Sequence, residues 1–199
     1  MDAELKEKLE NAIWIGKSLF ERNKVSGSSA NLSFLHKKNI YITGSGTCFG
    51  RLTQEQFSII NEDGQVLNNV KPSKELPLHQ MFYNKSDVIQ AVLHVHSFYA
   101  TLWSCRSSNT PQDVMPSYTP YLKMKLGRVG LVPYAKPGSQ ELFSNFAAVI
   151  DKSDGFILCN HGPIVGGKSL LDTFYILEEL EESAHIAWML RKEKVAQIE

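Results

Sequence analysis

The middle of the sequence contains a short apolar run with two histidines, Ala91-Val92-Leu93-His94-Val95-His96-Ser97. Aliphatic residues from Val88 onward favour a buried strand, and a polar turn over residues 84–87 precedes it. Because successive side chains of a strand point to opposite faces, His94 and His96 share one face, roughly 6–7 Å apart. At this spacing both imidazoles reach one metal ion. Two hydrogen-bonded structural histidines explain the pair equally well, so other residues must decide.

A third histidine stands at the end of another predicted strand. Residues 155–159 read as buried β-structure and lead directly into Asn160-His161-Gly162-Pro163. A histidine held between a strand end and a Gly-Pro turn is typical of a site residue on a rigid scaffold. Catalytic zinc centres commonly use three protein ligands and keep one position open, so His161 favours the metal interpretation of the pair.

Two loops of small residues follow the same pattern. Residues 26–31 precede a predicted strand at 32–35, and residues 43–47 follow one at 39–42. Their glycines and hydroxyl side chains let backbone N–H groups approach an anion closely. Neither loop has the spacing of a nucleotide-binding motif, so together they indicate a phosphate site without a nucleotide.

A carboxylate lies between the loops and the histidine pair. Ser73 is expected to cap a helix over residues 76–83, which places Ser73, Lys74 and Glu75 at its N-terminal end, where the helix dipole favours anions. Glu75 also reads as an ordinary first-turn acid, or as a carboxylate for the histidine pair. His79 is predicted to pack in the core from one face of this helix.

The remaining segments predict a mixed α/β chain. The last helix carries acids at 178, 179, 181 and 182, which are expected to form a solvated face. The expected elements are a helix at 2–22, a short helix capped by Thr53 and Gln56, a hairpin at 58–66, a helix at 97–104, a polar loop at 107–111, a strand at 129–132, a helix from Ser139 to about 151 and a helix at 169–191.

Composition limits the function classes. The chain has 199 residues, consistent with one domain over 1–199, and its 21 Lys and Arg balance its 21 Asp and Glu, so no basic field for nucleic acid is present. No apolar run reaches membrane-spanning length, and the charged N-terminus does not resemble a signal peptide. Three distant cysteines indicate buried free thiols and a cytoplasmic protein.

Taken together, these motifs resemble the class II aldolase/adducin family. The family-wide signature is Pro72-Ser73-Lys74-Glu75, then His94-Val95-His96-Ser97, then Asn160-His161-Gly162. Segments at 43–52, 119–121, 127–129, 131–134 and 136–138 are most similar to the 3-oxo-tetronate 4-phosphate decarboxylase branch. The resemblance implies an α/β fold, with a central, largely antiparallel sheet in three α/β/α layers. It also implies a homotetramer with active sites at subunit interfaces.

The resemblance also implies the site residues. A divalent ion, Zn²⁺ or another metal, would be bound by Glu75, His94, His96 and His161, with Glu75 as the catalytic acid/base. The phosphate-binding positions would be Asn31, Thr43, Gly44, Ser73 and Lys74. One departure is Ala30, where many members have glycine; its added methyl group narrows the first loop. Adducin-like members that lost catalysis lack the metal ligands, which this chain retains.

The implied reaction is decarboxylation of a 3-oxo-tetronate 4-phosphate to dihydroxyacetone phosphate and carbon dioxide through an enediolate. A sugar-phosphate aldolase of the fuculose or ribulose phosphate type, or a related epimerase, would use the same intermediate. A dehydratase of thio-sugar phosphates matches the flanking segments less well. A non-catalytic adducin-like scaffold is the remaining alternative. In each enzymatic case the partner is a small sugar phosphate, not nucleic acid or a membrane.

Overall fold

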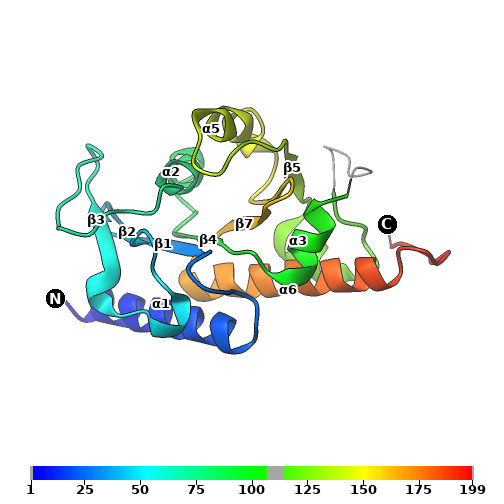
Figure 1. Ribbon diagram of the computed structural model, residues 1–199, viewed down its shortest axis with the longest axis horizontal. Helices are drawn as coiled ribbons and strands as arrows, with labels where there is room; N and C mark the ends of the chain where they lie inside the picture. The colour runs from blue at the N-terminus through cyan, green and yellow to red at the C-terminus, as the bar shows by residue number, and fades with distance from the viewer. Residues whose placement is uncertain (1, 107–113, 199) are drawn as a thin grey trace.

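The computed structural model describes residues 2–106 and 114–198, and a single seven-stranded sheet runs through its centre in the order β3-β2-β1-β4-β7-β6-β5 (Figure 1). All neighbouring strands are antiparallel except β5 and β6, which are parallel. The largely antiparallel sheet is therefore confirmed. The strands are β1 (Asn31–His36), β2 (Asn39–Thr43), β3 (Phe57–Ile60), β4 (Ala91–His94), β5 (Gly130–Val132), β6 (Gly155–Leu158) and β7 (Gly162–Gly167).

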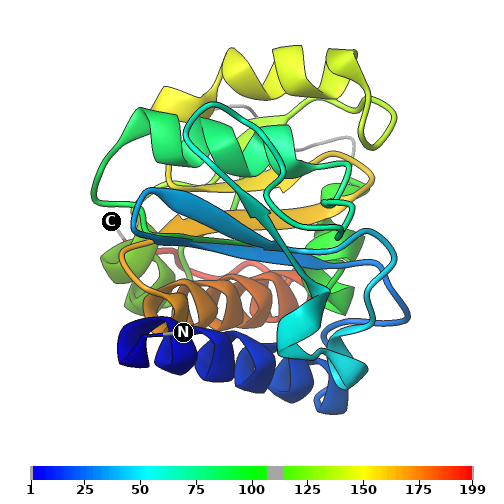
Figure 2. The same ribbon diagram turned by 90° about the vertical axis from the view of Figure 1, so that its left-hand side faces the viewer.

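Helices cover both faces of this sheet, which confirms the three-layer architecture (Figures 1 and 2). The larger core packs one face against α1 (Ala3–Glu21), α3 (Phe98–Ser104), α4 (Pro120–Leu126) and α6 (Leu170–Met189). A second core packs the other face against α2 (Leu76–Lys85) and α5 (Gln140–Ala147). Three short 3₁₀ turns complete the described elements: η1 (Phe49–Arg51), η2 (Gln54–Gln56) and η3 (Ile150–Lys152).

Side-chain caps explain where several helices begin. Leu5 N donates to Asp2 Oδ1 at 2.9 Å before α1, Leu142 N to Ser139 Oγ at 3.2 Å before α5, and Asp172 N to Ser169 Oγ at 3.1 Å before α6. Each bond satisfies a backbone donor that has no partner within the helix. The helices predicted to begin at Ser139 and Ser169 therefore begin there, and Ser97, expected near the cap of α3, is its N-cap residue without a side-chain cap bond.

The predicted cap at Ser73 is wrong. The helix begins at Leu76 as expected, but its N-cap residue is Glu75, two residues after Ser73, and Pro77 lies in its first turn, where a missing N–H is tolerated. Ser73 instead accepts a bond from Glu75 N at 3.3 Å, which tightens the turn before α2. Glu75, at the N-cap, is buried.

Two surface assignments are also corrected. Glu181 on α6 does not belong to a solvated face: it is 2% exposed, since its carboxylate points at the N-terminus of α3. The cysteines are free thiols, but Cys105 is exposed and Cys48 and Cys159 are half-buried, so they are not core residues.

Strand boundaries differ from the sequence pattern in two places. The predicted strand from Val88 is shorter, because Val88 is 69% exposed and β4 spans only Ala91–His94. The hairpin after β3 reduces to one bridge between Ile60 and Val66. The polar loop expected at 107–111 lies outside the described residues.

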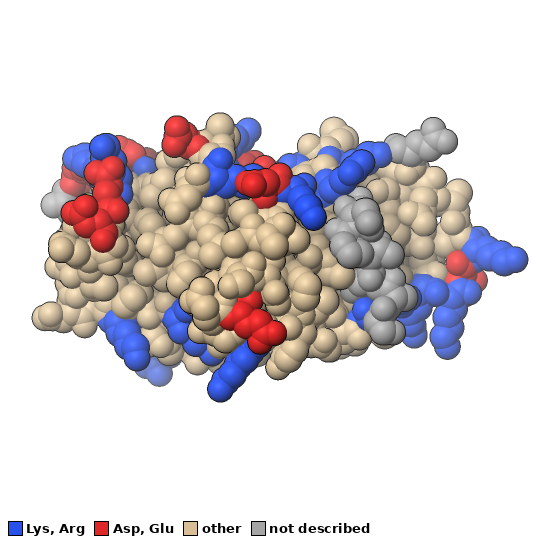
Figure 3. Space-filling model, turned by 90° about the horizontal axis from the view of Figure 1, so that it is seen from above, with Lys and Arg blue, Asp and Glu red and all other residues tan. Residues whose placement is uncertain are grey.

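The charge balance of the sequence is visible on the surface. On the face above α2 and α5, acidic and basic side chains lie in small separate groups with broad uncharged areas between them (Figure 3). Of the helices in the described part of the chain, none is both long enough and apolar enough to span a bilayer.

Candidate metal centre

Two neighbouring strands bring the three histidines together. His94 ends β4, and His96 follows it two residues later; His161 lies in the turn that joins β6 to β7. Because β4 and β7 are antiparallel with His94 opposite Ile164, the end of β4 lies beside the start of β7. The tight β6–β7 turn places Asn160 in the left-handed region at φ 53°. The predicted strand-end position of His161 is what puts it beside the pair.

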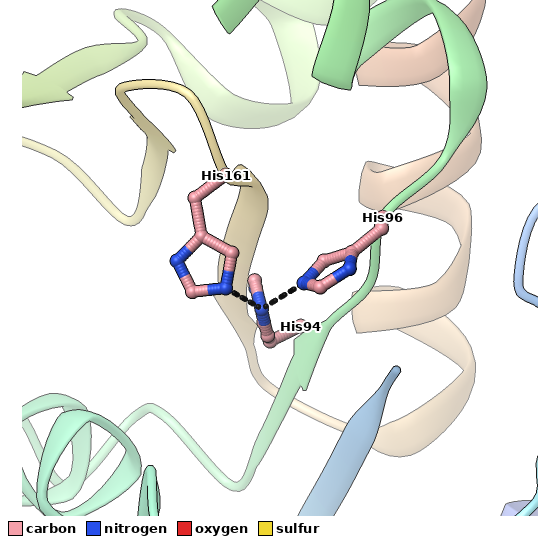
Figure 4. A group of neighbouring side chains, drawn as sticks. All are labelled: His94, His96 and His161. Carbon is pink, nitrogen blue, oxygen red and sulfur yellow. Dashed lines mark hydrogen bonds between the residues drawn. The ribbon is translucent and has the colours of Figure 1, made fainter. Parts of the chain in front are cut away.

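The three imidazoles point at a common centre (Figure 4). His94 Nε2 lies 3.2 Å from His96 Nε2 and 3.3 Å from His161 Nε2. Together the three residues form a group able to hold a metal ion. The Nδ1–H of His94 donates to the carbonyl of Pro163 at 2.8 Å, which leaves its Nε2 with a free lone pair facing the other two rings. A cation between the rings would satisfy all three nitrogens at once.

Glycine at position 162 permits this close approach. A Cβ added at Gly162 would lie 2.5 Å from the carbonyl oxygen of Val95 and 3.3 Å from the ring of His96. The turn that carries His161 therefore rests directly on the backbone between the other two histidines.

Glu75 completes the centre from α2. Its side chain is 5% exposed, with Oε2 3.5 Å from His94 Nε2 and Oε1 3.5 Å from His161 Nε2. Among the described residues, Glu75 Oε1 and His161 Nδ1 are buried without a hydrogen-bond partner. A buried carboxylate oxygen left unpaired beside three imidazole nitrogens fits a divalent cation, since a cation offsets the cost of burying it.

Electrostatics keep this donor set in its ligating form. Burial lowers the pKa of His96 and of His161 to about 4, and burial also lowers the pKa of His94. Burial alone would raise the pKa of Glu75, but the neighbouring His94 and His161 outweigh it and hold that pKa below its ordinary value. At neutral pH the histidines are therefore neutral and the carboxylate is ionised.

A cavity of about 350 Å³ opens beside Glu75, His96 and His161. This volume lies in the usual range for small-molecule sites. The two small-residue loops and the segment before α2 form its other walls, which include Asn31, Gly44, Ser73 and Lys74 from the predicted phosphate set. Ser28, Ser29, Ala30, Ser45, Gly46 and Pro137 also line it. All but Pro137 belong to loops whose composition indicates an anion site.

Thr43 is the one predicted phosphate residue that does not line the cavity. It is fully buried, and its Oγ1 accepts a bond from Leu32 N at 3.2 Å. This hydrogen bond links the end of the second loop to the strand that follows the first loop, on the side away from the cavity. Lys74 is exposed and lies along Gly138, where a Cβ would come within 2.9 Å of its Cδ.

Behind Glu75 lies a polar cluster that sequence reasoning missed. Asn31 Nδ2 donates to Glu75 Oε2 at 2.9 Å, and Asn31 Oδ1 bonds to His79 Nε2. His79 is fully buried, as predicted, but it is not a simple packing residue, because its Nδ1 bonds to Ser33 Oγ at 2.6 Å. The spacing of Glu75 and His79, one helical turn apart, is the only sequence signal for this cluster.

Comparison with known proteins agrees with this geometry. The family described as Class II Aldolase and Adducin N-terminal domain matches residues 10–188. The chain belongs to the class II aldolase and adducin family. A 3-oxo-tetronate 4-phosphate decarboxylase of Pectobacterium atrosepticum is 36% identical over 182 residues, covering 91% of this chain and 84% of that protein. An L-fuculose phosphate aldolase of Methanococcus maripaludis is 31% identical over 186 residues, covering 94% of this chain and 99% of that protein.

The fold of a solved family member matches closely. The crystal structure of YgbL from Escherichia coli superposes with a TM-score of 0.91 at 34% identity, covering 96% of this chain and 92% of that one. The predicted family resemblance is thus confirmed at the level of sequence and fold.

Proposed function

We propose that this protein is a metal-dependent lyase that decarboxylates a 3-oxo-tetronate 4-phosphate to dihydroxyacetone phosphate and carbon dioxide. The observation that carries this proposal is the convergence of His94, His96 and His161 with the buried carboxylate of Glu75 beside a cavity with loop-built walls. The chain is 36% identical to a decarboxylase and 31% identical to an aldolase, which supports a sugar acid phosphate over an aldolase's sugar phosphate as the substrate.

The loops and Lys74 would hold the phosphate end of the substrate. Ser73 offers a hydroxyl at the cavity wall, and the exposed ammonium of Lys74 supplies positive charge. Gly44 lines the same wall, with its own N–H bonded to the carbonyl of Gln56 at 2.8 Å. Binding the phosphate there would hold the reacting carbons near the histidines, so the binding energy of the phosphate would orient the substrate for reaction.

Glu75 would move the proton. In the reaction, the bond between the carboxyl carbon and C2 breaks, carbon dioxide leaves, and the electron pair remains as an enediolate across C2 and C3. A bound divalent ion, which we propose to be Zn²⁺, would supply Lewis-acid stabilisation of that charge. Glu75 Oε1, the oxygen without a protein hydrogen-bond partner among the described residues, would take up a proton from solvent and then deliver it to C2.

The second candidate is an L-fuculose phosphate-type aldolase, favoured by the relative that spans 94% of this chain. Retro-aldol cleavage leaves electrons on the same enediolate, so the same residues would serve it. We further propose a cytoplasmic homotetramer, on the basis of the family resemblance; analytical ultracentrifugation tests the assembly.

Replacing Glu75 by Gln tests the assigned chemistry. The variant keeps the shape of the side chain but cannot carry the proton, so we expect carbon dioxide release to fall by about 10³-fold while metal content stays at one ion per chain. Label in the substrate carboxyl carbon measures the release. Activity within a few-fold of the unmodified protein would remove Glu75 from the mechanism.

Replacing His94, His96 or His161 by Ala tests the metal centre itself. We expect each change to lower the metal-to-protein ratio measured by elemental analysis, because three nitrogen ligands become two. Replacing His185, a half-exposed histidine on α6, by Ala is the matched control and should leave the ratio unchanged. An unchanged ratio in all three site variants would refute the ligand assignment.

A further inference from the structure

A row of buried polar side chains runs from α2 and β1 to the carboxylate of Glu75. Tyr83 and His79 come from α2, and Ser33 and Asn31 from β1. Ser33 and His79 are fully buried, and Asn31 is 5% exposed. Only Asn31 reaches the cavity wall, so the rest of the row cannot touch substrate.

The hydrogen bonds of this row have one consistent direction. Asn31 must present its Nδ2 to Glu75 Oε2, because the opposite orientation would place two acceptor oxygens together. Its Oδ1 then requires a proton on His79 Nε2, which leaves His79 Nδ1 as an acceptor for Ser33 O–H. Ser33 Oγ in turn accepts from Tyr83 O–H, whose pKa burial raises. Every donor in the row points toward Glu75.

We propose that Asn31, His79 and Ser33 are positioning residues that hold Glu75 Oε2 and leave Oε1 as the oxygen that exchanges the proton. The inference rests on the proposed role of Glu75 and deepens it. A carboxylate held at one oxygen by a directed chain cannot rotate to exchange its two oxygens, so Oε1 stays 3.5 Å from His161 Nε2.

Packing alone does not explain the row. Burying three polar side chains between a strand and a helix is costly unless each is satisfied, and apolar residues would pack the same interface at no such cost. The chain also ends on an ionised group, which strengthens each bond along it. The row bonds only one of the two carboxylate oxygens of Glu75, Oε2, and this is the arrangement that would fix the orientation of the carboxylate.

The protonation pattern of His79 tests the chain without any substrate. Long-range ¹H–¹⁵N correlation of the ¹⁵N-histidine-labelled protein reports which ring nitrogen carries the proton. The His79→Gln spectrum assigns the resonance by its disappearance. We expect a neutral ring protonated at Nε2 and bare at Nδ1. A ring protonated at Nδ1, or a doubly protonated ring, overturns the proposal.

A matched pair of substitutions tests its effect on turnover. His79→Gln places an amide N–H near the position of Nε2 and can still donate to Asn31, whereas His79→Asn reaches only toward Ser33. We expect His79→Asn to lower kcat by about 10²-fold with KM within about twofold, as misplacement of a reacting group does. His79→Gln should stay within about fivefold of the unmodified protein. Phe82→Leu, in the same helix but packed toward α5, controls for lost stability.

The outcomes separate the two proposals. Equal activity of the Gln and Asn variants, or losses that merely follow their melting temperatures as in Phe82→Leu, overturn the positioning role. The kinetic comparison uses whichever of 3-oxo-tetronate 4-phosphate or L-fuculose 1-phosphate the unmodified protein converts. If it converts neither, the proposed function fails, and the protonation pattern of His79 alone decides the inference.

Discussion

At the scale of single residues, burying the histidines of the metal centre makes the stability of the metal-free protein depend on pH. Burial lowers the pKa of His96 and His161 to about 4, below the 6.5 of an unfolded histidine. As pH falls from 6.5 toward 4, the unfolded chain therefore binds protons that the folded chain does not, and stability falls. We expect the metal-free protein to lose about 1.4 kcal/mol per pH unit for each histidine that stays neutral, measured by urea unfolding. His161→Ala should show a shallower dependence; equal slopes would contradict this.

Gly162 offers a second test at this scale. Gly162→Ala would force its new Cβ against the Val95 carbonyl, 2.5 Å away, and push His161 from the other histidines. Gly130→Ala creates a clash of the same size, 2.5 Å, against the Phe156 ring. We expect both to destabilise the protein, but only Gly162→Ala to lower metal content by elemental analysis. Equal metal loss would show that the effect is general destabilisation.

The limits of sequence reasoning are also clearest in single residues. The three histidines are predictable because strand alternation and a strand-end turn constrain where they point. The role of Glu75 followed only from the family resemblance, since the local pattern fits an ordinary first-turn acid equally well. The bonds of Asn31 and Thr43 are not, since both are set by how β1, β2 and α2 pack together. Local patterns indicated an anion-binding loop but not which of its side chains face inward.

At the scale of elements, α3 depends on a residue far away in sequence. Glu181 on α6 accepts bonds from Tyr99 N at 3.1 Å and Ala100 N at 2.9 Å, and pairs with Lys24 at 3.3 Å. It therefore caps the helix that follows His96. We expect Glu181→Ala to cost about 2–4 kcal/mol, because two backbone donors and a half-buried ammonium lose their partner. Exposed Glu182→Ala should change stability by less than about 0.5 kcal/mol in the same urea titration. Equal costs would contradict the capping role.

The same element shows why local pattern misled. A run of four acids on a helix normally faces solvent, and only the position of α3 reveals that Glu181 faces inward. Likewise, Gly162-Pro163 was expected to form a turn, but these residues open β7, which pairs with β4 and β6 on either side. Both errors arise because long-range pairing overrode local signals.

For the whole molecule, we expect a bound metal ion to increase the free energy of unfolding. The ligands come from the ends of sheet strands and from the start of α2, so a bound ion would link the sheet to the helix layer that contains α2. A metal present at about 1,000 times its Kd contributes about 4 kcal/mol, which corresponds to about 10 °C in melting temperature. We expect a chelator to lower the melting temperature of the unmodified protein by that amount and to leave His161→Ala unchanged. An equal shift in both proteins would place the chelator effect elsewhere.

The overall architecture could be predicted from the sequence more fully than the order and direction of the strands. The three-layer arrangement and the largely antiparallel sheet followed from the family resemblance, which in turn depended on a few motif residues near His94 and His161. The order of strands and the parallel β5–β6 pair had no local signal in the sequence.

The most direct test of the central claim is a comparison of two substrates on the zinc-loaded protein, with dihydroxyacetone phosphate measured in a coupled assay. The proposed function predicts rapid release from 3-oxo-tetronate 4-phosphate, with one carbon dioxide per product, and little from L-fuculose 1-phosphate. Cleavage of L-fuculose 1-phosphate without action on the acid would contradict it and make the protein an aldolase.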